Sequence, residues 1–145
     1  MIESALATYL KARTTVLAIV GTSVYASRAP QKTAAQTPVQ PRIVYQLLPG
    51  SRRHYHTTGA SGLVEADIEL LCIEKTYAKA RILYEAIRNE IDGFSGTWGT
   101  TAIDQCLLST PTDATGNPTQ GDDMGFPCVS CVAAIVYVEA VPVPV

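Results

Sequence analysis

The stretch LVEADIELLCI, residues Leu63 to Ile73, decides the fold of this chain. Apolar and acidic residues alternate along it, and a period of two is typical of a β-strand with one buried and one solvated face. The acids of the solvated face are Glu65, Asp67 and Glu69. The sequence therefore predicts a strand that packs its other face onto a core. The residues of that core face are Val64, Ala66, Ile68, Leu70 and Cys72.

A helix is expected directly after this strand. It begins at Lys75 or Thr76, runs to about Ile91 and ends at Asp92-Gly93, because glycine accepts the backbone conformation that closes a helix. Its apolar residues recur at helical spacing on one stripe, so the helix is expected to lie against the sheet with its polar side outward. The stripe consists of Ala80, Leu83, Tyr84, Ile87 and Ile91.

The remaining segments add a second helix and further strands. The N-terminal helix spans Ile2 to Arg13, and a short helical turn from Val16 to Val20 follows it and ends at Gly21. Phe94 to Gly99 is rich in glycine and is expected to be a loop. The further strands are expected at Val24–Ala26, Arg42–Leu48, Thr101–Thr110 and Cys128–Glu139.

These elements predict one α+β domain over residues 1–140, followed by an extended tail of alternating valine and proline at 141–145. Its architecture is expected to be a mainly antiparallel sheet of four to five strands with two helices packed on one face. The last strand is apolar on both faces in places, which predicts a position in the middle of the sheet. Residues 27–41 and 111–127 are expected to be long loops.

The composition argues against two classes of partner. A net charge of −2 gives no bulk attraction for nucleic acid. The first residues, Met1-Ile2-Glu3, carry an acid where a secretory signal has a basic residue, and no apolar run is long enough to span a membrane. We therefore expect a soluble protein that is made in a cytoplasm and has no membrane partner.

Four cysteines raise the question of a metal or redox centre. Cys128 and Cys131 have the spacing of half a zinc knuckle, but a strand would turn them to opposite faces. A redox pair usually lies at a helix N-terminus, whereas a β-rich run follows here. Cys72 and Cys106 are isolated, and a reducing compartment favours free buried thiols. We expect no metal and no cofactor.

Residue patterns typical of catalysis are missing from the sequence. Both histidines, His54 and His56, lie in one glycine-bounded loop, and there is no nucleophile-elbow pattern Gly-x-Ser-x-Gly. The series Gly93, Gly96 and Gly99 lacks the lysine of a phosphate-binding loop and follows a helix instead of a strand. We therefore expect a protein that is not an enzyme.

Two surfaces remain as candidate sites. The acids of the alternating strand form either the solvated outer face of a sheet or a functional surface that repels polyanions such as DNA. Within the hairpin connection 49–62, a basic segment surrounds one aromatic residue and is either a solvated hairpin or a docking loop for a partner. The residues of this docking loop are Arg52, Arg53, His54, Tyr55 and His56.

Several short motifs follow one another in a fixed order. After the first helix come Ile19-Val20-Gly21-x-x-Val24-Tyr25 and then Pro41-Arg42-Ile43-Val44-Tyr45-Gln46. Gly59 to Ile73 supplies the strand after the hairpin loop, and Lys75-Thr76-Tyr77-x-x-Ala80 leads into the helix. In this order and spacing, over nearly its whole length, the chain resembles the tail-completion or tail-terminator proteins of long-tailed bacteriophages. The long 111–127 loop and the 141–145 tail depart from that pattern.

The resemblance implies a structural virion protein at the head–tail junction, assembled in the host cytoplasm. It implies a homohexameric ring that caps the tail tube and joins it to the head, so the partners are the chain itself, the tail-tube protein and the head–tail connector or stopper protein. Genomic DNA would pass through the lumen without specific binding.

In such a ring, Glu65, Asp67 and Glu69 are expected to face the channel or a neighbouring subunit, and the docking loop is expected to contact a partner protein. Two alternatives stay open. One is another neck or tail-tube structural protein, and the other is a small-ligand binding module that uses a pocket between loop and sheet.

Overall fold

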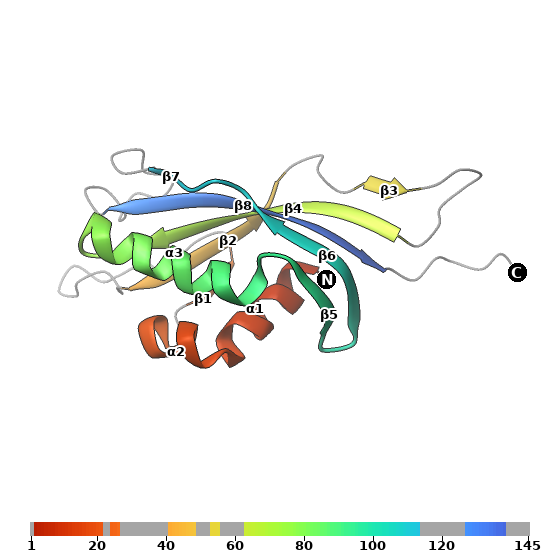
Figure 1. Ribbon diagram of the computed structural model, residues 1–145, viewed down its shortest axis with the longest axis horizontal. Helices are drawn as coiled ribbons and strands as arrows, with labels where there is room; N and C mark the ends of the chain where they lie inside the picture. The colour runs from red at the N-terminus through yellow and green to blue at the C-terminus, as the bar shows by residue number, and fades with distance from the viewer. Residues whose placement is uncertain are drawn as a thin grey trace, which may run out of the picture.

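The chain folds into one sheet and a layer of helices on one side of it (Figure 1). The structure is a computed structural model, and the residues that it describes are 2–21, 24–26, 41–48, 53–55, 63–113 and 127–138. The helices are α1 (Ile2–Ala12), α2 (Thr14–Val20) and α3 (Tyr77–Ile91). The strands are β1 (Val24–Ala26), β2 (Arg42–Leu47), β3 (Arg53–Tyr55), β4 (Leu63–Ile73), β5 (Phe94–Trp98), β6 (Thr101–Leu108), β7 (Thr112–Asp113) and β8 (Cys128–Val138).

The alternating stretch forms β4 with the predicted bounds, and β4 lies at the centre of the sheet. The strand order is β1-β2-β4-β8-β6-β5, while β3 pairs with β4 and β7 with β8. β4 and β8 pair along their whole length, from Leu63 opposite Val138 to Ile73 opposite Cys128. The predicted central position of the last strand is therefore confirmed.

The sheet is larger than the predicted four to five strands, and it is mixed. The described residues form eight strands, of which β1 and β2 are parallel and the other pairs antiparallel. β3 and β7 have three and two residues, too few for any period to be visible in the sequence. The predicted count of two helices is also wrong, because α2 is a third helix, separate from α1.

The loop predicted at Phe94–Gly99 is instead mostly strand β5. Its glycines suggested a turn throughout, but only Gly99, with a φ of +63°, lies in the turn that leads to β6. The rest of the segment pairs with β6, with a bulge between Phe94 and Gly96. Pairing with a neighbouring strand thus overrides the weak local preference.

The ends of the helices follow the predicted residues. Thr76 is the N-cap of α3, and its side-chain oxygen accepts a hydrogen bond from the backbone N–H of Lys79 at 3.2 Å. Gly93, with a φ of +78°, follows α3, and Gly21, with a φ of +59°, ends α2. No helix in the described ranges has both the length and the apolar character needed to cross a membrane.

The core lies between the helices and the inner face of the sheet. Alternate residues of β4 are fully buried there, as the period of two predicts, and the apolar stripe of α3 packs against them. Each buried Ile or Leu side chain contributes about 1.5–3 kcal/mol. The inner residues of β4 and the stripe of α3 are Val64, Ala66, Ile68, Leu70, Cys72, Ala80, Leu83, Tyr84, Ile87 and Ile91.

Three aromatic rings join α1 to the edge strand β5. The Tyr9 ring lies 5.2 Å from that of Phe94 and 5.5 Å from that of Trp98, measured between centroids. The rings of Phe94 and Trp98 are themselves 5.5 Å apart. Such pairs add about 0.5–1.5 kcal/mol beyond the area that they bury. The cluster therefore fixes one end of α1 on the sheet.

Candidate interaction surface

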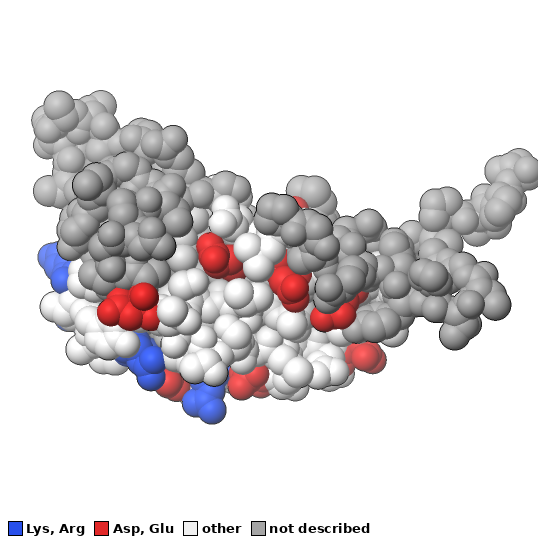
Figure 2. Space-filling model, turned by 90° about the horizontal axis from the view of Figure 1, so that it is seen from above, with Lys and Arg blue, Asp and Glu red and all other residues white. Residues whose placement is uncertain are grey.

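The acids of β4 lie on the side of the sheet that the helices leave open. Glu65, Asp67 and Glu69 are half-buried, and each lies between fully buried inner residues. Gln46 of β2 lies opposite Glu69 and donates a hydrogen bond from Nε2 to Oε1 of Glu69 at 3.1 Å. Figure 2 shows acidic side chains across this side, with coloured Lys and Arg only at its margin. The alternation along β4 thus places the three acids on the side of the sheet opposite the core, as the period of two predicts.

Apolar side chains lie directly beside these acids. The residues of β8 that pair with Glu65, Asp67 and Glu69 are Val136, Ala134 and Val132. Residues opposite each other in an antiparallel ladder share a face, so the two rows lie side by side. Val138 is 54% exposed, and Leu107 of β6, which pairs with Ala134, is 48% exposed. We call this side of the sheet the outer face. It consists of Glu65, Asp67, Glu69, Val132, Ala134, Val136, Val138 and Leu107.

One end of this side of the sheet is buried. Val44, Leu71 and Ile73 form a small apolar cluster there, and Tyr25 and Cys128 pack against it. The accessible part of β4 is therefore its first half, where acids alternate with core residues. The partly exposed valines beside the acids make this side of the sheet a candidate contact surface for a protein partner.

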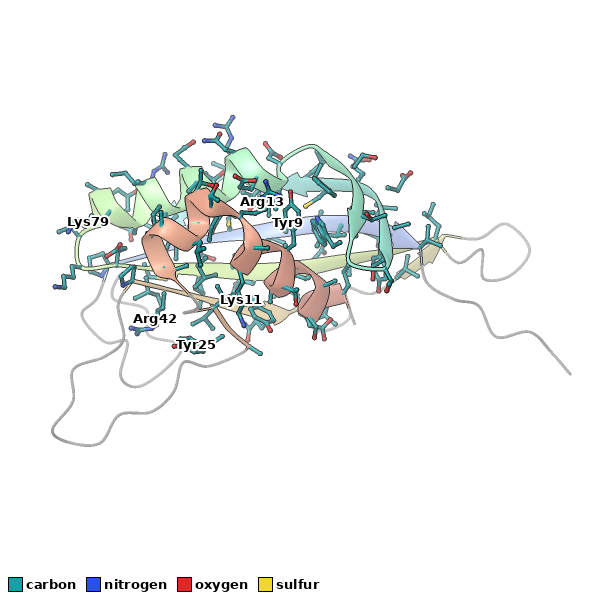
Figure 3. All side chains as sticks on the ribbon, turned by 90° about the horizontal axis from the view of Figure 1, so that it is seen from below. Tyr9, Lys11, Arg13, Tyr25, Arg42 and Lys79 are labelled. Carbon is teal, nitrogen blue, oxygen red and sulfur yellow. The ribbon has the colours of Figure 1, made fainter. Side chains whose placement is uncertain are left out.

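The exposed cations with described side chains belong to the helical layer. Figure 3 shows Lys11, Arg13 and Lys79 on the side of the helices. Arg42 of β2 is fully buried. The helical layer also carries the acids Glu3, Glu85, Glu90 and Asp92, so it presents charges of both signs, whereas the exposed cations with described side chains are missing from the acidic side of the sheet. The exposed or half-exposed cations of the helical layer are Lys11, Arg13, Lys75, Lys79, Arg81 and Arg88.

The predicted docking loop is described only in part. Arg53 to Tyr55 form strand β3, with Arg53 opposite Glu65 and Tyr55 opposite Leu63 of β4. Arg52 and His56 lie outside the described residues. The middle of the expected hairpin connection is therefore tied to the sheet at the end of β4 that carries the acids.

The cysteines are arranged as a strand with a period of two predicts. Cys131 belongs to the core on the helical side, whereas Cys128 packs on the opposite side of the sheet. Burial raises the pKa of Cys128 to about 11 and that of Cys131 to about 12, and Glu69 adds to both shifts. Burial also raises the pKa of Cys106 to about 12 and that of Cys72 well above its usual value. All four thiols are therefore protonated at neutral pH.

Two surface hollows are large enough for a small ligand. One, of about 310 Å³, lies between α3 and the end of β6, and Arg88 in it is paired with Glu85 at 3.3 Å and Asp92 at 3.7 Å. The other, of about 270 Å³, lies between α1 and the β5–β6 turn and is lined by Thr8 and Trp98, among others. Within the described residues, no group of three or more His, Cys, Asp or Glu could hold a metal ion. In the first hollow, the Ser109 hydroxyl donates to the carbonyl of Thr110 at 3.4 Å and accepts from the N–H of Val132 at 2.8 Å, so its hydrogen bonds go to the backbone.

The sequence patterns did not single out one exposed apolar residue, Ile82. Ile82 of α3 is 60% exposed, on the side of the helix away from the core, and Tyr77 at the start of α3 is 45% exposed. The sequence does contain a sign of this exposure, because Ile82 falls outside the apolar stripe that the helical period defines. A single apolar residue off the stripe is common on helices, so by itself it does not indicate a contact surface.

The comparisons with known proteins concern the fold alone. No protein-family model matches the chain, and no curated protein sequence matches it. A solved chain from the virion of a native gene transfer agent particle is similar over 95% of this chain and 95% of its own length, with a TM-score of 0.63 and 17% identity. A second solved chain, with no function described, is similar over 98% of this chain and 93% of its own length, with a TM-score of 0.53 and 14% identity.

Proposed function

We propose that this chain is a structural virion protein, a tail terminator that forms a homohexameric ring, caps the tail tube and joins it to the head connector. The observation that carries the proposal is the fold that it shares, end to end, with a chain from a gene transfer agent virion. The similarity covers 95% of both chains, so the whole described fold takes part in the comparison. The order of the sequence motifs adds the tail-terminator role.

The surface chemistry supports an assembly role. The helices leave one side of the sheet open, and valines lie on it beside acids. A monomer gains nothing from the exposed Val138 and the partly exposed valines beside it, whereas a subunit of a ring gains contact area from them. In the hollow between α3 and β6, the charges of Arg88, Glu85 and Asp92 are paired with one another and the Ser109 hydroxyl is hydrogen-bonded to the backbone.

Each candidate site has a role under this proposal. Glu65, Asp67 and Glu69 face the channel or a neighbouring subunit, and in the channel they would repel passing DNA. The docking loop contacts the connector or stopper protein on one side of the ring, and the tail-tube protein binds the other. Localisation is the virion, at the head–tail junction, after assembly in the host cytoplasm.

The position of the protein in an intact particle tests the proposal. Cryo-electron microscopy of purified particles is expected to show a single sixfold ring of this chain between head and tail tube. Native mass spectrometry of purified protein is expected to show a species of six times 15.5 kDa, or about 93 kDa. A protein that is monomeric at every concentration and missing from purified particles would refute the proposal.

The alternative within the same class is another neck or tail-tube protein. It differs in copy number and place, because a tube protein would appear in many stacked rings along the tail. The micrographs that test the first reading therefore also decide between the two.

A further inference from the structure

We propose that the exposed side of α3 in one copy docks on the outer face of the next copy, and that this contact builds the ring. The inference rests on the proposed function and decides a question which that function leaves open. It assigns Glu65, Asp67 and Glu69 to a contact between subunits instead of the channel wall. The occupant of the outer face is thus a second copy of this chain.

The helix offers an apolar centre with a lysine on one flank and an arginine beside a glutamate on the other. Ile82 is the most exposed of the large hydrophobic side chains that the structure describes, at 60%. At 3.6 residues per turn, Lys79 lies about 60° from Ile82 on one flank, and on the other flank Glu85 lies about 60° away and Arg81 about 100° away. Ala78, one turn before Ile82, is exposed and small, so it lets this side of the helix approach a flat surface closely.

The charges nearby on α3 do not oppose such a contact. Glu85 is one turn after Arg81, but its carboxylate is paired with Arg88 at 3.3 Å. Arg81 lies over the ring of Tyr84, with 5.7 Å between the guanidinium carbon and the ring centroid. That contact holds the cation on the surface without neutralising it.

The outer face offers the complementary pattern. Its apolar row, Val132 to Val138 of β8, runs beside the acidic row of β4, with Val136 paired to Glu65 and Ala134 to Asp67. When Ile82 lies on the valines, one cationic flank of α3 lies over the acids. The fifteen residues of α3 span about 22 Å and the eleven of β8 about 36 Å, so the helix fits along the strand.

Two different surfaces make this a head-to-tail contact. The helical side and the outer face lie on opposite sides of one sheet (Figure 1). A contact between unlike surfaces leaves one of each free at every step, so it generates a ring when the rotation closes. A contact between like surfaces would pair acids with acids and stop at a dimer. The like contact would set the acidic rows of two copies against each other, so the contact of α3 with the outer face favours ring growth.

Two variants, one at the exposed Ile82 and one at the half-buried Val136, test the contact. Ile82→Asp damages only the helical side, and Val136→Asp only the outer face. Each is expected to be a folded monomer by circular dichroism and native mass spectrometry, with ring stability lowered about 30-fold or more. Leu17→Asp is the matched control, because Leu17 is 42% exposed on α2 and outside the contact. The control is expected to form rings like the wild type.

A mixture of the two variants reports the direction of the contact. Each Ile82→Asp copy keeps a good outer face and each Val136→Asp copy keeps a good α3, so the mixture is expected to form heterodimers and no ring. Charge exchange gives an independent readout. Lys79→Glu with Arg81→Glu is expected to dissociate the ring, and adding Glu65→Lys, Asp67→Lys and Glu69→Lys is expected to restore it in part.

Intact rings of Val136→Asp would overturn the inference and leave the proposed function standing, because the outer face would then line the channel. A failure of charge exchange to restore any association would also count against it. A wild-type chain that forms no ring under any condition would refute the proposed function itself, and the inference with it.

Discussion

Glu90, in the last turn of α3, forms an ion pair with Arg13 across the helical layer, with 3.0 Å between Oε2 and Nε. Its other carboxylate oxygen accepts a hydrogen bond from the Thr15 hydroxyl at 2.7 Å. Arg13 and Thr15 belong to the junction between α1 and α2, so one carboxylate joins all three helices. The Glu90 side chain is only 17% exposed, which limits screening by solvent.

Glu90→Gln is expected to lower the free energy of unfolding by about 1 kcal/mol, because it removes the charge from both contacts and keeps the shape. For a chain of this size the melting temperature should fall by roughly 2–4 °C. Urea unfolding followed by circular dichroism measures the effect. Glu85→Gln is the matched control on the same helix: its partner Arg88 is exposed and also pairs with Asp92. An equal loss in both variants would contradict the tie between the helices.

Stability is expected to fall at alkaline pH because of the buried thiols. A thiol in the unfolded chain ionises near pH 8.5, whereas burial raises the pKa of Cys106 and Cys131 to about 12 and that of Cys128 to about 11. The folded state then holds more protons than the unfolded state above about pH 8.5, so the free energy of unfolding falls as the pH rises. The contribution is complete below that pH and is lost on the way to pH 11–12.

The size of this loss is about 1–2 kcal/mol per buried thiol at pH 10. Urea unfolding at about pH 7.5, 9 and 10 measures the slope. Cys131→Ala is expected to be less stable at neutral pH but to lose less on going to pH 10. A slope unchanged by this substitution would show that other groups cause the alkaline loss.

Elements in which apolar residues recur with a clear period could be predicted from the sequence. Strands that form only because they pair with a neighbouring strand could not. β4 and α3 were predicted within a residue or two, because alternation and a helical stripe each extend over many positions. β5 contains Gly96 and precedes Gly99, so its local signals indicate a turn, and only pairing with β6 makes it a strand. β3 and β7 are shorter than any period that a sequence can display.

Trp98 is expected to tolerate replacement by phenylalanine better than its burial suggests. It is only 1% exposed, and the described residues provide no hydrogen-bond acceptor for its buried Nε1. Phe keeps part of the stacking with Tyr9 and Phe94 and removes a buried donor that lowers stability by about 1–3 kcal/mol. We expect a loss of about 1–2 kcal/mol for Trp98→Phe, against about 3–5 kcal/mol for Trp98→Ala.

Urea unfolding followed by far-ultraviolet circular dichroism compares the two variants without relying on indole fluorescence. In the wild type, Trp98 is the only tryptophan, so its emission is expected to be blue-shifted and resistant to quenchers until the chain unfolds. Equal losses for Trp98→Phe and Trp98→Ala would indicate that the indole N–H has a partner that stabilises it.

The residues of the outer face could be predicted from the sequence, but the role proposed for Ile82 on the helical side could not. The period of two in β4 placed Glu65 on the open side, and pairing with β8 then placed Val136 beside it. The importance of Ile82 depends on its exposure in the fold and on a surface of another copy that it would contact. A contact between copies leaves no periodic signal in one chain, so a sequence pattern cannot reveal it.

The docking loop can be tested without disturbing the sheet, because β3 supplies a natural boundary. Arg53 to Tyr55 pair with β4, so deleting them would remove a ladder as well as a loop. Arg52→Ala with His56→Ala changes the positions on either side and keeps the strand. We expect normal ring formation and fewer joined particles, since a loop that contacts a partner contributes through a few exposed side chains.

The measurement is the ratio of free tails to complete particles in negative-stain micrographs, together with infectivity. Lys11→Ala is the matched control, since it removes an exposed cation from α1 and leaves the loop unchanged. Its particles should join as in the wild type. If the double variant also joins normally, the basic residues of the loop are solvated, and the partner contact must be sought on another surface of the ring.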